Sequence, residues 1–104
     1  MELFLKTQDG AFAKGQYDVE KGVFIVKKGS RISERLHIAH MVYGVKSILS
    51  NREKYCKDGI TLKDLEFSSP SAAANFVTGR SCNGLRDWKD ESGKRLKVIL
   101  QEMK

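Results

Sequence analysis

The chain has 104 residues, of which 40% are apolar and 31% charged, and its formal net charge is +6. This length and composition predict a single domain over residues 1–104 with one hydrophobic core, and they exclude an intrinsically disordered chain. Lys6 interrupts the first apolar run, which excludes a secretory signal, and no run approaches the roughly 18 residues of a membrane helix. We therefore expect a cytoplasmic protein whose Cys56 and Cys82 are free thiols.

The first thirty residues predict an N-terminal antiparallel meander, because short apolar runs alternate with turn signals. Leu3-Phe4-Leu5 is the first run. Asp9-Gly10 suits the type I′ turn of a hairpin, which would lead into a strand over 11–17 with Phe12 facing the core. Val23-Phe24-Ile25-Val26, apolar on both faces, predicts a central strand.

The middle of the chain is harder to interpret. Residues 31–49 show neither a two-residue nor a 3.6-residue apolar period, so no element is assigned to them. Ser50 and Glu53 have the spacing of a capping box, which predicts a helix over about 51–57 that ends at Asp58-Gly59. Residues 60–67 predict a short extended segment or a tight turn that leads into one.

Two helices are predicted in the last third of the chain. Ser69-Pro70, three alanines and Gly79 supply helix start and stop signals in the right order, so a helix is expected over 69–78. The free N–H groups at its start offer a docking point for a phosphate. A C-terminal helix is indicated by an apolar stripe at Leu96, Ile99, Leu100 and Met103. The predicted fold is α+β: a small antiparallel sheet of three or more strands, packed against the Ala-rich and C-terminal helices.

Positive charge is concentrated in two windows. Residues 27–35 hold four cations and one anion, residues 79–97 hold six cations and three anions, and the other nine cations and nine anions cancel. Such windows favour phosphate contacts, with an evenly charged surface as the alternative. Trp88 would stack on a base if exposed, or pack against the alanines if buried. The candidate nucleic-acid-binding residues are Lys27, Lys28, Arg31, Arg80, Asn83, Arg86, Trp88 and Lys89.

Catalytic and metal-binding patterns are weak. His37, His40, Cys56 and Cys82 are candidate zinc ligands, but the cysteines stand alone instead of forming the close pairs of structural zinc sites. Cys82 has cations nearby but no histidine close to it in sequence to act as its base. Asp87-Trp88-Lys89 has the acid-x-lysine spacing of some metal-dependent nucleases. We expect no enzyme activity, metal or cofactor.

A family resemblance is carried by Ser69-Pro70-Ser71-Ala72-Ala73-Ala74, Gly79-Arg80-Ser81, Asn83-Gly84 and Trp88-Lys89. These residues, within a stretch of about 11–97, resemble an uncharacterised bacterial family, domain of unknown function 4357. Its members occur alone, or C-terminal to GIY-YIG nuclease domains and near restriction-modification proteins, and similar modules accompany DNA adenine methylases. The sequence departs from the family pattern at Cys82, where a small residue such as alanine is usual, and at Leu85, where a tryptophan or another long side chain often stands.

Charge placement and resemblance together favour a non-catalytic, accessory nucleic-acid-binding module. The expected ligand is DNA, the expected protein partner is a nuclease or methylase, and the expected state is a monomer or weak dimer. Two alternatives stay open. One is a protein-interaction module that binds an acidic partner through the same basic surface, and the other is a metal-dependent nuclease.

Overall fold

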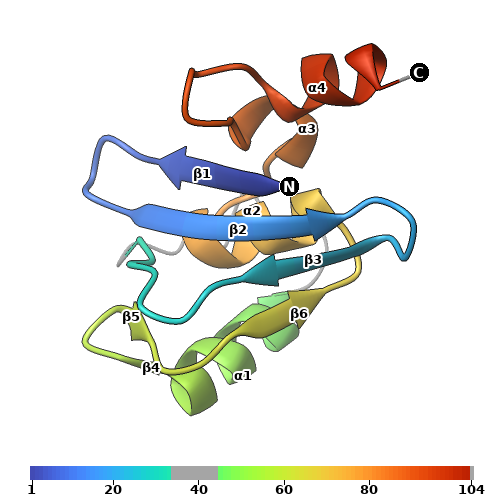
Figure 1. The fold of residues 1–104 in the computed structure, drawn as a ribbon. Helices are drawn as coiled ribbons and strands as arrows, with labels where there is room; N and C mark the ends of the chain where they lie inside the picture. Colours follow the sequence, from blue (N-terminus) through green and yellow to red (C-terminus); the bar gives the residue numbers. More distant parts are fainter. Residues whose placement is uncertain (34–44, 104) are drawn as a thin grey trace.

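A computed structural model describes residues 1–33 and 45–103. The chain forms an α+β fold around a four-stranded antiparallel sheet with the strand order β1-β2-β3-β6 (Figure 1). The predicted class and the N-terminal meander are confirmed, and β3 is a central strand as expected. The strands of this sheet are β1 (Glu2–Lys6), β2 (Phe12–Asp18), β3 (Val23–Val26) and β6 (Leu65–Phe67).

Helices cover one face of the sheet and one of its edges. α2 lies behind the strands in Figure 1, while α3 and α4 lie beyond the β1 edge and α1 lies near β6. The remaining elements are α1 (Val45–Tyr55), β4 (Cys56–Lys57), β5 (Ile60–Thr61), α2 (Pro70–Thr78), α3 (Gly84–Asp87) and α4 (Leu96–Glu102). None of these helices has both the length and the apolar character needed to cross a membrane. Within the described residues no helix covers the opposite side of the sheet, which we call the open face.

The core lies between the sheet and α2, and a glycine determines which residues of β2 face it. A Cβ atom at Gly15 would lie 2.4 Å from Cε1 of Phe24, so only glycine fits beside that ring. Because side chains alternate along a strand, Ala13 also faces the core, and Phe12 and Lys14 face outward. Phe12 is 45% exposed, so the prediction that it faces the core is wrong.

α2 has the boundaries that its sequence predicts. Ser69 Oγ accepts a hydrogen bond from the Ala72 N–H at 3.0 Å, Pro70 occupies the first turn, and Gly79 ends the helix in the left-handed conformation with φ of +73°. The inward side of the helix buries Ala73, Phe76 and Val77 against the sheet. α2 therefore has defined caps at both ends and is buried against the sheet.

Both Asp-Gly pairs lie in hairpin connections, but neither forms the turn or the helix end that was predicted for it. Gly10 has a φ of +96° but Asp9 does not have a positive φ, so the β1–β2 connection is not the expected type I′ turn. Asp58 and Gly59, at +53° and +78°, form the two-residue turn of the β4–β5 hairpin instead of ending a helix. The preceding helix spans Val45–Tyr55, so Ser50 lies inside it and is not its N-cap. The predicted zinc ligands His37 and His40 lie outside the described residues.

Candidate nucleic-acid interface

Trp88 is a core residue and not part of an exposed binding surface. Its side chain is fully buried, with its ring centroid 4.5 Å from that of Phe24. The indole Nε1–H donates a hydrogen bond of 2.9 Å to the backbone oxygen of Pro70, which satisfies its polar atom inside the core. Of the two alternatives for Trp88, an exposed ring that stacks on a base or a buried ring that packs at the alanine helix, the structure shows the second. This position removes Trp88 from the candidates that could stack on a base.

The N-terminus of α2 is also closed to a phosphate by the chain itself. The Gly84 N–H donates to Ser71 Oγ at 2.9 Å, and a Cβ at Gly84 would lie 2.3 Å from the carbonyl carbon of Pro70. Glycine is required for this close approach between the start of α3 and the start of α2. The contact sets the position of α3 on α2, and with it the backbone positions of Asn83 and Arg86.

Between α3 and α4 lies a groove of about 410 Å³, which we call the α3–α4 groove. Its lining contains three cations, two amides, one valine and no carboxylate: Asn83, Arg86, Arg95, Lys97, Val98 and Gln101. Two of these, Asn83 and Arg86, are among the predicted residues. Arg95, Lys97 and Gln101 were not, although Lys97 and Gln101 are four residues apart on one helix and so lie on the same side of it.

Local hydrogen bonds hold both walls of the groove. Asn83 is the N-cap of α3, and its Oδ1 accepts from the Leu85 N–H at 3.0 Å. Arg95 precedes the first residue of α4, and its backbone oxygen accepts from the N–H groups of Val98 and Ile99. Backbone pairing between Lys89 and Arg95 connects the two walls. Backbone hydrogen bonds therefore hold α3 and α4, the two walls of the groove, in place relative to each other.

The charges of the groove are mostly free to meet a ligand. Arg86 Nε donates to Asp87 Oδ1 at 3.1 Å, which raises the pKa of Arg86, but its side chain is 59% exposed and a guanidinium has further donors. Among the described residues, no carboxylate lies within ion-pair distance of Arg95 or Lys97. A phosphate in the groove would therefore meet Arg95 and Lys97, which have no carboxylate partner among the described residues, and Arg86, which also pairs with Asp87.

The first basic window lies elsewhere, at the end of the sheet where β3 runs into the loop before α1. Lys27 Nζ lies 3.0 Å from Asp64 Oδ2, and the Lys28 N–H donates to Asp64 Oδ1 at 2.8 Å. These bonds lower the pKa of the Asp64 carboxyl, the Lys28 N–H contributing most. Arg31 is exposed and pairs through its backbone with Phe12. Lys27 and Lys28 thus lie outside the α3–α4 groove, and the charge of Lys27 is paired with that of Asp64.

The two remaining predicted cations, Lys89 and Arg80, lie at two separate sites. Lys89 is exposed at the β1 edge, where its backbone pairs with both Phe4 and Arg95. Arg80 is exposed just after Gly79, at the C-terminal end of α2 on the covered side of the sheet. Lys89 therefore adjoins the groove, and Arg80 belongs to neither the groove nor the open face.

The catalytic candidates gain no support from their surroundings. Burial raises the pKa of the Cys82 thiol more than the hydrogen bond from Thr78 and the charge of Arg80 lower it, so its neighbours do not produce a thiolate. Cys56 and Cys82 are both free. In the described part of the chain, histidine, cysteine and carboxylate side chains form no group of three that could hold a metal ion.

Comparison with known proteins gives one result. No curated protein and no solved structure matches the chain. One family does match, over residues 3–100, which extends the resemblance at both ends beyond residues 11–97. The match includes the whole four-stranded sheet except Glu2, and α4 up to Leu100. The chain belongs to the family described as a domain of unknown function (DUF4357).

Proposed function

We propose that this protein is a non-catalytic accessory module that binds nucleic acid through the α3–α4 groove. The observation that carries the proposal is the lining of the groove, which combines Arg86, Arg95 and Lys97 with two amide side chains and contains no carboxylate. Cations bind backbone phosphates and release condensed counterions, which is the main source of affinity in sequence-independent binding. Arginine adds paired donors that match the geometry of phosphate oxygens.

The amides and the shape of the groove agree with contacts to a nucleic-acid backbone. Asn83 and Gln101 can donate to phosphate or sugar oxygens, which position a ligand without distinguishing its sequence. Five of the six lining side chains end in a cation or an amide, whereas a small-molecule pocket usually has only a few such polar groups. The proposal therefore predicts modest affinity and little sequence preference.

The proposed partners follow from the resemblance noted in the sequence. Modules of this kind behind GIY-YIG nuclease domains and near restriction-modification proteins support DNA as the ligand, and a nuclease or methylase as the protein that supplies the chemistry. A cytoplasmic location and a monomeric or weakly dimeric state are part of the same proposal. The competing proposal is that the groove binds an acidic protein instead.

Charge reversal in the groove tests the proposal. Arg95→Glu/Lys97→Glu alters two cations without a carboxylate partner among the described residues, and Lys21→Glu/Lys57→Glu makes the same change of net charge at two exposed sites away from the groove. Binding of labelled duplex and single-stranded DNA is measured by fluorescence anisotropy at about 50 mM salt. We expect the groove variant to bind at least about tenfold more weakly, and the control variant to bind within about twofold of the wild type.

Two results would contradict the proposal. Equal losses in both variants would show that only net charge matters and that the groove is not a site. Absence of binding to every probe at low salt, together with capture of an acidic nuclease or methylase by the wild type but not by the groove variant, would favour the protein-docking function.

A further inference from the structure

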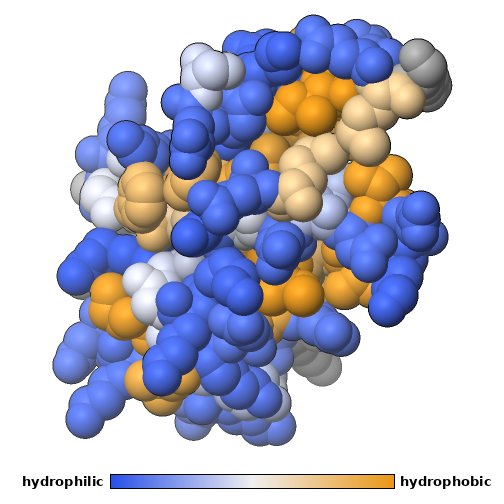
Figure 2. All heavy atoms as spheres, viewed as in Figure 1, coloured by the Kyte–Doolittle hydropathy of each residue, from blue (hydrophilic) through white to orange (hydrophobic). Residues whose placement is uncertain are grey.

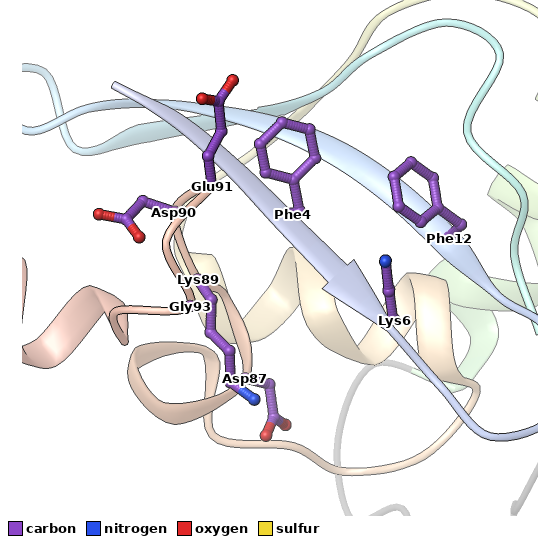
Figure 3. A pocket seen from close by; sticks show the side chains of 8 residues that line it. All are labelled: Phe4, Lys6, Phe12, Asp87, Lys89, Asp90, Glu91 and Gly93. Atoms are coloured by element: carbon purple, nitrogen blue, oxygen red, sulfur yellow. The ribbon is translucent and has the colours of Figure 1, made fainter.

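Two phenylalanines lie side by side on the open face, although a strand facing water usually carries polar side chains there. Phe4 on β1 and Phe12 on β2 have ring centroids 6.1 Å apart with an angle of 37° between their planes. Figure 3 shows both rings extending from the same side of the sheet. In Figure 2, which views this face, apolar groups interrupt a hydrophilic surface. Phe12 is 45% exposed and Phe4 is half-buried, and neither ring fills the core, which lies on the other side of the sheet.

Cations flank the rings in register across the strands. Phe12 pairs with Lys6 on one side and with Arg31 on the other, and directly paired residues direct their side chains to the same face. Lys6 Nζ lies 5.3 Å from the Phe12 ring centroid. Among the described residues, neither Lys6 nor Arg31 has a carboxylate within ion-pair distance. An aromatic surface is thus bordered by two cations free to bind phosphate.

A pocket of about 390 Å³ lies over this surface and is bounded by the loop after α3. Phe4, Phe12 and Lys6 line one side of it, and Asp87, Lys89, Asp90, Glu91 and Gly93 line the other. Figure 3 shows Glu91 extending on the same side of the sheet as the Phe4 ring. Carboxylates repel phosphate but accept hydrogen bonds from the N–H groups of an unpaired base, such as N3–H of thymine. The pocket therefore suits an uncharged base of a nucleic acid. The side with Lys6 and Arg31 suits the phosphate backbone that carries this base.

We propose, as an extension of the proposed function, that the open face gives the module a preference for single-stranded nucleic acid. An unpaired base stacks on Phe4 and Phe12, and the adjoining phosphates lie along Lys6 and Arg31. The strand continues past Lys89, whose backbone pairs with both Phe4 and Arg95, into the α3–α4 groove. A duplex reaches the groove but keeps its bases stacked inside the helix, so it gains nothing from the two rings.

Substitutions of Phe12 test this preference. Phe12→Ala removes the ring, Phe12→Leu keeps an apolar side chain without an aromatic face, and Leu62→Ala is the control, since Leu62 is 50% exposed at a site outside the pocket. The probes are oligo-dT and a duplex of the same length. Both Phe12 variants should bind oligo-dT about 5- to 150-fold more weakly and bind the duplex within about twofold of the wild type, whereas Leu62→Ala should change neither.

The outcomes separate this inference from the proposed function. If the groove variant loses both probes while the Phe12 variants bind oligo-dT like the wild type, the single-strand site is overturned and the groove stands. If oligo-dT binds no more tightly than the duplex to the wild-type protein, the preference is overturned as well. A titration of the wild type followed by NMR of the phenylalanine ring protons gives a readout that does not depend on any variant folding. Unchanged Phe12 ring resonances at saturation with oligo-dT would also overturn the site.

Discussion

Replacing Gly84 by alanine tests how the binding groove is attached to the core. The added Cβ would lie 2.3 Å from the Pro70 carbonyl carbon, 2.4 Å from the Ser71 nitrogen and 2.5 Å from the Pro70 oxygen. Ordinary contacts of a Cβ begin at 3.4 Å, so α3 would have to retreat by roughly an ångström from backbone atoms that are themselves fixed in α2. The retreat would lengthen the 2.9 Å hydrogen bond from the Gly84 N–H to Ser71 Oγ.

The expected loss of stability follows from these two effects. Overpacking of this kind costs about 1–3 kcal/mol, and a weakened hydrogen bond adds about 1 kcal/mol. We therefore expect Gly84→Ala to lower the free energy of unfolding by about 2–4 kcal/mol, a large part of the roughly 5–15 kcal/mol of a typical domain. The exposed neighbour Ser81 supplies a control, and Ser81→Ala should stay within about 0.5 kcal/mol of the wild type.

Urea denaturation followed by circular dichroism measures the change. DNA binding of the folded Gly84→Ala protein should also weaken, because Asn83 and Arg86 move with α3. A Gly84→Ala protein as stable as the wild type would refute the reasoning, since it would mean that α3 does not rest on the first turn of α2.

Three further predictions concern the fold. Ser69→Ala should lower the free energy of unfolding by about 0.5–2 kcal/mol, and an unchanged urea midpoint would contradict the cap. Hydrogen bonds, first from Ser33 and then from Thr7, hold the pKa of the Asp9 carboxyl below its ordinary value, so they stabilise the fold above about pH 4 and this contribution is lost as the pH falls through the lowered pKa. Asp9→Asn should make unfolding less sensitive to acid, and an unaltered pH profile would argue against these bonds. Burial raises the pKa of the Cys56 and Cys82 thiols, so both should react with a disulfide reagent at pH 7.5 more slowly than free cysteine; equal rates would show that neither is protected.

The sequence predicts those parts of the fold whose signals are local. Ser69, Pro70 and Gly79 specify the start and end of α2 by their own backbone and side-chain preferences, whatever surrounds them. The Asp-Gly pairs show where local signals fail. The same dipeptide forms a two-residue turn at Asp58-Gly59 and a wider loop at Asp9-Gly10, where the Thr7 hydroxyl accepts a hydrogen bond from the Ala11 N–H.

The binding surfaces are less predictable because they depend on register and packing. Phe12 faces solvent because Gly15, three residues later, is the residue that fits against Phe24 and Trp88, and that contact spans two strands and a distant loop. Lys6 lay outside both charge windows but faces the pocket with Phe12. Lys97 was inside a window, and its position in the groove depends on how α4 packs against α3. Charge counts along the chain predict a basic surface without locating it.

The salt dependence of binding tests the central claim, that groove cations neutralise phosphates, most directly. Each phosphate contact contributes about 0.7 to the slope of log K against log salt for a single strand and about 0.9 for a duplex. Arg95→Gln/Lys97→Gln removes two of these contacts without introducing repulsion, so its slope should be smaller in magnitude by about 1.4 with oligo-dT and about 1.8 with duplex DNA. The matched variant Lys21→Gln/Lys57→Gln should keep the wild-type slope. Identical slopes for the wild type and the groove variant would contradict phosphate binding in the α3–α4 groove.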